Sequence, residues 1–280
     1  MHLSKILLFI FIVFSGSLVF AQNDFKRIVS LAPSLTEELC QLGAADKIIG
    51  ITTYCTRPEY IQEKEKVASI IEVNLEKLIT LKPDVVLTIP LTDQKAKQAI
   101  KNLGIELVEF PRAKNFPDIC SQMLKLGSII QQEDKAKKLV QRAQEKFNQV
   151  KTKVKLDNQP KVFIQIGFKP LATANKEYFI DDLITQAGGI NIASESPGVL
   201  YSREKVIELN PDIIIIANMG ITGEKEEEHW SKYKSLSAVK KNKIYTVDSY
   251  KYCCPTLDNF VNAYEEIVSF FNEGEINSEE

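Results

Sequence analysis

The chain has 280 residues, 44% of them hydrophobic and 26% charged, which is typical of a soluble globular protein and long enough for two domains. Its formal net charge of -2 leaves no basic surplus of the kind that binds nucleic acid. The only histidines are His2 and His229, which excludes a metal site built from several imidazoles.

The first 21 residues differ in character from the rest of the chain. Lys5 precedes an apolar run over residues 6–14, and small residues follow before Ala21. This run is far shorter than the roughly 20 residues that span a bilayer, so the pattern predicts a secretory signal peptide cleaved after Ala21. We therefore expect a periplasmic mature protein.

Short apolar runs alternate with helical periodicity in the next part of the chain. This alternation is typical of parallel βα units, because each strand that is buried on both faces needs a crossover helix. We expect helices at residues 34–43, 74–81 and 94–104 and strands at residues 27–32, 47–52, 84–89 and 105–110.

A single long amphipathic helix is predicted over residues 133–154, where apolar residues recur every three or four positions. The βα pattern then resumes, with strands at 161–167, 212–218 and 243–248 and helices at 179–189, 202–209 and 256–271. The predicted fold class is α/β, with two Rossmann-like lobes joined by a long backbone helix. The predicted boundaries are a leader at 1–21, lobe one at 22–127, the linking helix at 128–157, and lobe two at 158–280 with a frayed acidic tail.

An internal repeat relates the two halves. Residues 74–87 (NLEKLITLKPDVVL) match residues 202–215 (SREKVIELNPDIII) in register, which indicates two similar domains. The repeat places Glu76 and Glu204 at equivalent positions in the first turn of a helix. Two interpretations are open. Each carboxylate compensates the dipole of its own helix, or the two together form a docking site for a partner.

No motif indicates catalysis. The chain lacks the glycine-rich dinucleotide and P-loop motifs and the hydrolase nucleophile elbow, and His229 follows a charged run typical of a surface. These observations favour a binding protein over an enzyme.

The five cysteines are an odd number, so at least one has no partner within the chain. Cys40 and Cys120 lie in helical segments and are expected in the core. Cys55, Cys253 and Cys254 lie beside prolines in loops. They could ligate a soft metal, pair with one another or fill space.

Segments across the predicted mature chain resemble the periplasmic solute-binding proteins of ABC importers for iron complexes and corrinoids, in particular the cobalamin-binding members. The resemblance is carried, in the expected order, by residues 27–59 (RIVSLAPSLTEELCQLGAADKIIGITTYCTRPE), 67–87 (VASIIEVNLEKLITLKPDVVL), 201–216 (YSREKVIELNPDIIII) and 243–263 (KIYTVDSYKYCCPTLDNFVNA). It implies two α/β lobes that hold a ligand between them.

The resemblance also implies partners. Glu76 and Glu204 stand at the positions where family members dock onto arginines of a dimeric permease in the inner membrane. The protein is expected to act as a monomer without a resident cofactor, its ligand being a small-molecule metal chelate.

The expected ligand site lies in loops at the carboxyl ends of strands. By the resemblance, Tyr54, Asp248 and Tyr250 match positions that touch ligand, and Phe168 lies in such a loop without matching residue for residue. The full expected set is Ser34, Tyr54, Cys55, Arg57, Phe168, Asp248, Tyr250 and Tyr252.

The sequence departs from the corrinoid binders at several positions. Isoleucines Ile70 and Ile89 stand in place of tryptophans, and Ala187 in place of a disulfide cysteine. Arg57 could instead pair with a carboxylate of haem, a siderophore or a corrinoid. The ligand therefore stays open among these three, and the alternative function is an extracytoplasmic metal-handling or redox protein that uses Cys55, Cys253 and Cys254.

Overall fold

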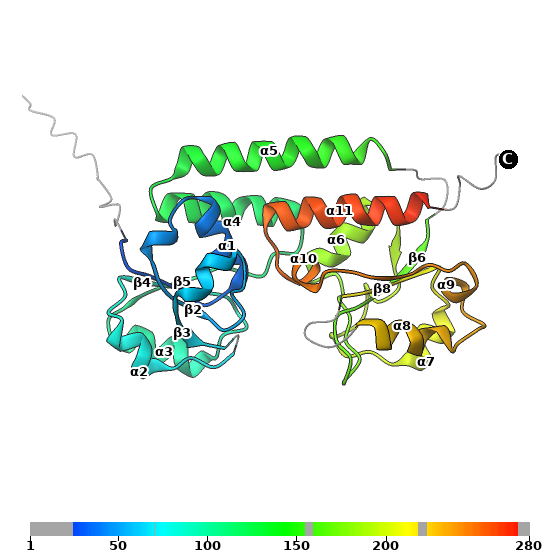
Figure 1. Ribbon diagram of the computed structural model, residues 1–280, viewed down its shortest axis with the longest axis horizontal. Coiled ribbons are helices and arrows are strands. Elements are labelled where there is room, and N and C mark those ends of the chain that lie inside the picture. Colours follow the sequence, from blue (N-terminus) through cyan, green and yellow to red (C-terminus); the bar gives the residue numbers. More distant parts are fainter. Residues whose placement is uncertain (1–24, 70, 155–158, 218–222, 274–280) are drawn as a thin grey trace, which may run out of the picture.

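The computed structural model describes residues 25–69, 71–154, 159–217 and 223–273 (Figure 1). The predicted leader and acidic tail lie outside these residues. Within the described part of the chain, no helix is long and apolar enough to cross a membrane.

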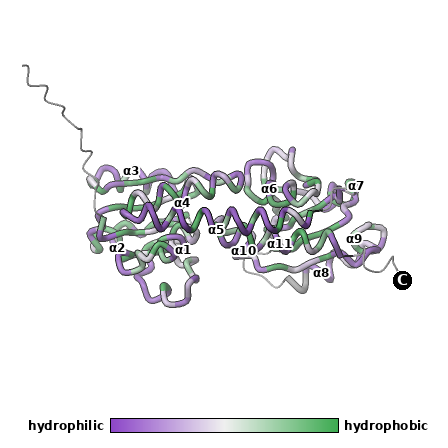
Figure 2. The backbone as a smooth tube through the Cα atoms, turned by 90° about the horizontal axis from the view of Figure 1, so that it is seen from above, coloured by the Kyte–Doolittle hydropathy of each residue, from purple (hydrophilic) through white to green (hydrophobic). Residues whose placement is uncertain are grey.

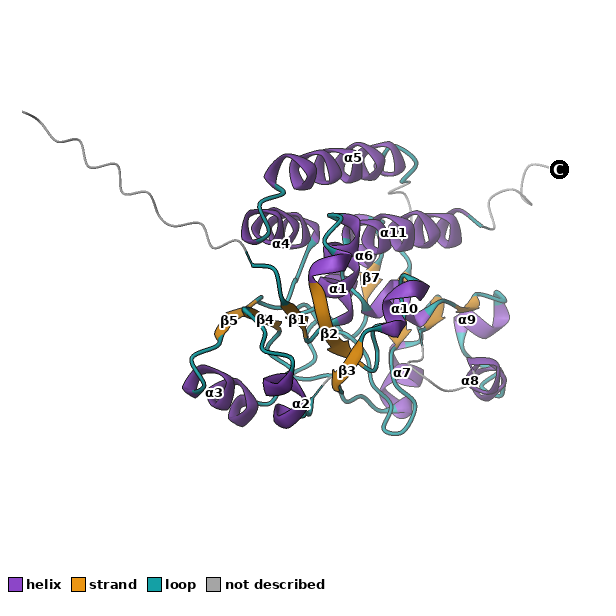
Figure 3. Cartoon of the chain, turned by 60° about the vertical axis from the view of Figure 1, so that its left-hand side comes forward, coloured by secondary structure: helices purple, strands orange, loops and turns teal. Residues whose placement is uncertain are grey.

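Lobe one is built on a five-stranded parallel sheet in the order β3-β2-β1-β4-β5, which Figure 3 shows across its lower left. The strands are β1 (Ile28–Ser30), β2 (Ile48–Thr52), β3 (Glu65–Ala68), β4 (Val85–Thr88) and β5 (Glu106–Glu109). The helices are α1 (Pro33–Gln41), α2 (Leu75–Thr80), α3 (Gln94–Asn102) and α4 (Phe116–Ile129). Strand β3, with only Val67 and Ala68 buried, was not predicted because an edge strand this short carries little apolar signal.

Lobe two has a similar architecture, with a four-stranded parallel sheet in the order β7-β6-β8-β9. Its strands are β6 (Lys161–Gln165), β7 (Ile190–Asn191), β8 (Ile213–Ile216) and β9 (Ile244–Thr246). Its helices are α6 (Phe179–Gln186), α7 (Arg203–Leu209), α8 (Gly223–Ser231), α9 (Ser237–Lys240), α10 (Ser249–Cys253) and α11 (Leu257–Asn272). The segment 248–254, expected as a loop, contains the short helix α10.

The central strands of both sheets are buried on both faces, as their apolar sequences predict. In β8, Ile213 and Ile215 point into a core shared with lobe one, whereas Ile214 and Ile216 point into a separate core of lobe two. Successive side chains of a strand point to opposite faces, so four consecutive isoleucines fill two layers. The two-lobed parallel α/β architecture predicted from the sequence is thus confirmed.

Helix α5 (Glu133–Lys151) runs along the molecule over α4 and α11, which belong to different lobes (Figure 1). It ends three residues before the predicted end at Val154. Most of its residues are hydrophilic (Figure 2), and only its inner positions are buried. Gly127 of α4 allows the close approach, since a Cβ there would lie 2.5 Å from the Cβ of Ala136 in α5.

Candidate functional site

The expected ligand residues lie mainly where strands end at the junction of the two lobes. Residues 53–57 follow β2 in lobe one, and Asp248 follows β9 in lobe two. Such carboxyl ends are where open α/β sheets bind ligands, because the chain leaves the sheet there and its loops converge. The region 219–230 is described only from residue 223 onward.

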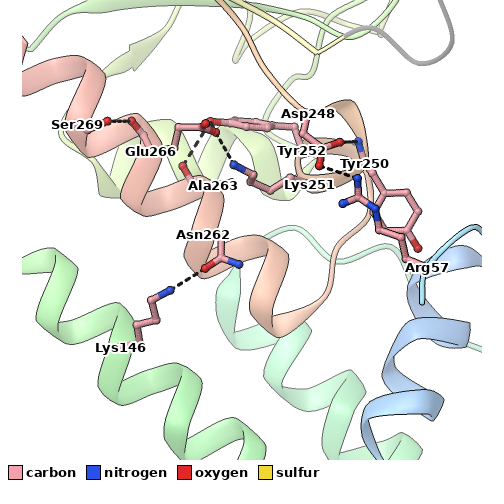
Figure 4. Close-up of polar contacts among 10 residues, drawn as sticks. All are labelled: Arg57, Lys146, Asp248, Tyr250, Lys251, Tyr252, Asn262, Ala263, Glu266 and Ser269. Atoms are coloured by element: carbon pink, nitrogen blue, oxygen red, sulfur yellow. Dashed lines mark hydrogen bonds and ion pairs between the residues drawn. The ribbon is translucent and has the colours of Figure 1, made fainter. Parts of the chain in front are cut away.

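Three of the expected residues meet across the lobes (Figure 4). Nη2 of Arg57 lies 2.8 Å from Oδ2 of Asp248, and the guanidinium carbon lies 4.5 Å from the centre of the Tyr250 ring. The other carboxylate oxygen of Asp248 accepts a hydrogen bond from the Tyr250 backbone N–H at 3.0 Å, which caps α10. One arginine of lobe one is therefore bound by a carboxylate and an aromatic face of lobe two.

Two of the expected residues, Cys55 and Tyr252, are fully buried. The thiol of Cys55 lies 3.2 Å from the hydroxyls of Thr36 and Thr52. The hydroxyl of Tyr252 donates to Glu266 at 2.9 Å. Neither side chain has exposed surface in this structure, which favours a role in supporting the junction over direct contact with a ligand.

The other expected ligand residues differ in exposure. Tyr54 is 55% exposed and thus accessible, whereas Ser34, in the first turn of α1, is buried. Phe168 is half-buried in the loop after β6, with Nζ of Lys169 5.1 Å from its ring centre.

A second contact across the lobes was missed from the sequence. The guanidinium of Arg112 lies 4.4 Å from the ring centre of Tyr178, and Nζ of Lys114 lies 2.5 Å from a carboxylate oxygen of Glu177. The lysine lowers the pKa of the Glu177 carboxyl by its hydrogen bond. Arg112 follows β5, so the rule that selected the other loops would have selected this one too.

The thiols do not form a reactive or metal-binding group. All five cysteines are free, and the described residues contain no cluster of three or more metal-ligating side chains. Burial raises the pKa of Cys253 to about 12 and that of Cys254 well above its usual value. Because the thiolate is the metal ligand and the nucleophile, the raised pKa values of Cys253 and Cys254 disfavour the metal-handling or redox alternative.

Two carboxyl groups of α1 lie against the start of α11 in lobe two, Glu37 half-buried and Glu38 fully buried. Glu37 accepts a hydrogen bond from Thr256 at 3.4 Å, and Glu38 is 1% exposed, with its carboxyl facing the backbone of Leu257. Burial first, and then the charge of Glu37, raises the pKa of Glu38 well above its usual value. Burial at this lobe contact thus favours the neutral form of the Glu38 carboxyl.

The described surface contains two large hollows away from the expected residues. One, of about 510 Å³, lies between the lobes and is lined in part by Lys114, Lys151 and Asp182. The other, of about 770 Å³, lies on lobe two beside Leu200 and Tyr201. Neither is lined by Arg57, Asp248 or Tyr250.

Glu76 and Glu204 are both exposed in the first turns of α2 and α7. Within the described residues, neither carboxylate takes part in a hydrogen bond or an ion pair. Figure 1 shows α2 and α7 at the bottom of the two lobes, on the side opposite α5. The repeat therefore presents two free carboxylates on one side of the molecule.

Comparisons with known proteins agree with this architecture. A family model described as periplasmic binding protein matches residues 28–251. An uncharacterized ABC transporter substrate-binding lipoprotein of Bacillus subtilis is 33% identical, with the match covering 81% of this chain and 74% of that protein. A vitamin B12-binding protein of Vibrio parahaemolyticus is 25% identical over 96% of this chain and 97% of its own.

Solved structures show the same fold. A periplasmic haem-binding protein of Pseudomonas aeruginosa aligns with a TM-score of 0.81 at 18% identity, over 89% of this chain and 94% of its own. A periplasmic vitamin B12-binding protein of Vibrio cholerae aligns with a TM-score of 0.78 at 22% identity, over 89% and 97%. With a family model that covers most of its length, the chain belongs to the periplasmic binding protein family.

Proposed function

We propose that this protein is the ligand-capturing subunit of an ABC importer for a metal chelate of the haem, iron-siderophore or corrinoid type. The observation that carries the proposal is the meeting of Arg57, Asp248 and Tyr250 across the two lobes. An arginine and aromatic faces suit a flat or aromatic chelate with acidic groups. Relatives named for vitamin B12 and haem support the same ligand class.

We further propose that the lobes, at residues 22–127 and 158–280, act as units about the segment 128–157. The parallel sheets lie on either side of this segment, and the loops at their strand ends provide polar contacts between the lobes. Residues 1–21 would direct export to the periplasm and be removed after Ala21. Sequencing the amino terminus of the exported protein should then begin at Gln22.

The ligand class is tested by titration with a panel of haem, cobalamin, cobinamide and ferric siderophores. We expect one class of chelate to bind with one-to-one stoichiometry. Binding is measured by calorimetry and by the change in visible absorbance of the chelate. The only tryptophan, Trp230, is fully buried, so absorbance is the better signal. Absence of binding by every member of the panel would remove the proposed function.

Delivery is proposed to use Glu76 and Glu204 as docking groups for arginines of a dimeric permease, with the binding protein acting as a monomer. Exposed ion pairs contribute only about 0–1 kcal/mol each, so the pair would set orientation more than affinity. We expect the double variant Glu76→Arg/Glu204→Arg to bind ligand normally and to abolish uptake into cells.

The matched control is Asp134→Arg/Glu145→Arg, which reverses two exposed carboxylates of α5 on the opposite side of the molecule. This control should leave uptake unchanged. Normal uptake by the Glu76/Glu204 variant would exclude the docking role.

A further inference from the structure

We infer that the ligand is an anion, and that its acidic oxygens bind lobe one by replacing carboxylates of lobe two at Arg57 and at Lys114. This inference rests on the proposed function and specifies its ligand. Asp248 and Glu177 would then act as internal substitutes for the ligand, rather than as ligand contacts.

The polar contacts between the lobes at Arg57 and at Lys114 have the same arrangement of charge. Lobe one supplies the cations Arg57, Arg112 and Lys114, and lobe two supplies the carboxylates Asp248 and Glu177. Lobe two also supplies the aromatic rings that the two arginines face. When the lobes part, lobe one therefore keeps unneutralised cations at its edge, and lobe two keeps carboxylates that repel an anion.

The two contact points are separate. Arg57 follows β2, whereas Arg112 and Lys114 follow β5, and β1 and β4 lie between these strands. Three strand spacings of roughly 4.8 Å place β2 and β5 about 14 Å apart in the sheet. Both points thus offer cations to different parts of a ligand, and each can be altered alone.

The internal pairs are weak enough to be exchanged. The side chains of Arg57 and Asp248 are 48% and 39% exposed, and those of Lys114 and Glu177 are similarly exposed. Exposed pairs of this kind contribute about 0–1 kcal/mol. A ligand carboxylate or catecholate can bind the arginine fork with both oxygens, while Asp248 is bonded to Arg57 through one oxygen and to the Tyr250 N–H through the other.

The test compares Arg57→Gln with Asp248→Asn, using haem and a ferric tris-catecholate as anionic probes and a neutral ferric hydroxamate as reference. We expect Arg57→Gln to weaken binding of the anionic probe by tenfold or more. Asp248→Asn removes the competitor and should tighten binding several-fold. Arg112→Gln should weaken the same probe, and added salt should reduce these differences by screening.

The control is Lys241→Gln, which breaks the ion pair of Lys241 with Asp212 within lobe two, where the two side chains are 56% and 31% exposed. It should leave the affinity unchanged. Circular dichroism and thermal unfolding of each variant establish that it is folded before its affinity is compared.

Weaker binding by Asp248→Asn, to the extent seen for Arg57→Gln, would overturn the inference, because Asp248 would then contact the ligand directly. Tight binding of the neutral probe alone, unaffected by Arg57→Gln, would overturn it while the proposed function stands. Binding of no chelate at all would overturn both.

Discussion

Tyr250 and Tyr252 lie two residues apart in α10 and have opposite surroundings. The ring of Tyr250 faces Arg57 of lobe one, whereas Tyr252 is fully buried against α11. Residues two apart on a helix point away from each other. The sequence predicted a ligand role for both, because spacing alone did not show which tyrosine faces the junction.

At the residue scale, Glu38 makes folding depend on pH. Its pKa is raised in the folded state, by burial first and then by the charges of Glu37 and Asp258, while its carboxyl faces the backbone of Leu257. We therefore expect the folded protein to keep a proton on Glu38 that the unfolded chain loses above the ordinary carboxyl pKa of 4.5. Stability falls as the pH rises above that value.

We expect Glu38→Gln to remove most of this fall, since the glutamine stays neutral. At pH 8 the free energy of unfolding of the variant should exceed that of the wild type by about 1.4 kcal/mol for each unit of the pKa shift. Near pH 4 the two free energies should differ little. Urea unfolding at pH 4, 6 and 8 measures this, with the exposed Glu145→Gln as control. Parallel pH curves for Glu38→Gln and wild type would show that Glu38 is not the cause.

At the scale of elements, the repeat is reproduced in detail. The side chains of Asn74 and Ser202 cap α2 and α7 by accepting hydrogen bonds from Lys77 N–H and Lys205 N–H. After the helices, Lys82 and Asn210 have φ angles of 47° and 46°, in the left-handed region. Each precedes a proline, so the same local rule ends both helices and turns the chain into a buried strand.

We expect Asn74→Ala and Ser202→Ala each to lower the free energy of unfolding by about 1 kcal/mol, because each leaves a helix N–H without its cap. Asn74→Ser should retain most of the stability, since serine caps about as well as asparagine. Chemical denaturation of the purified variants gives the values. Equal stability of the alanine and serine variants would show that the cap contributes nothing here.

At the scale of the whole molecule, the lobes share an aromatic core beneath α5. Phe260 of α11 is fully buried and stacks on Phe116 of α4, with ring centres 4.8 Å apart. Phe147 of α5 lies 4.8 Å from Phe116 and 4.7 Å from Tyr264 of α11. The polar contacts at Arg57 and Arg112 are exposed by comparison, so the lobes are held firmly on the α5 side and weakly elsewhere.

We expect Phe260→Ala to lower the free energy of unfolding by about 3–5 kcal/mol, because it leaves a cavity in this shared core. Phe260→Leu should cost less than about 1.5 kcal/mol. Differential scanning calorimetry and urea unfolding measure both variants. A loss below 1 kcal/mol for the alanine variant would show that the aromatic core does not hold the lobes together.

The sequence by itself determined the two parallel α/β lobes, the long helix between them and the exposed pair Glu76 and Glu204. These follow from local patterns, since apolar periodicity, caps and proline stops act over a few residues. Only the tertiary structure decided that Arg57 meets Asp248 and that Cys55 and Tyr252 are buried. These outcomes depend on how residues about 190 positions apart approach one another, and on side-chain directions that change with a shift of one or two residues.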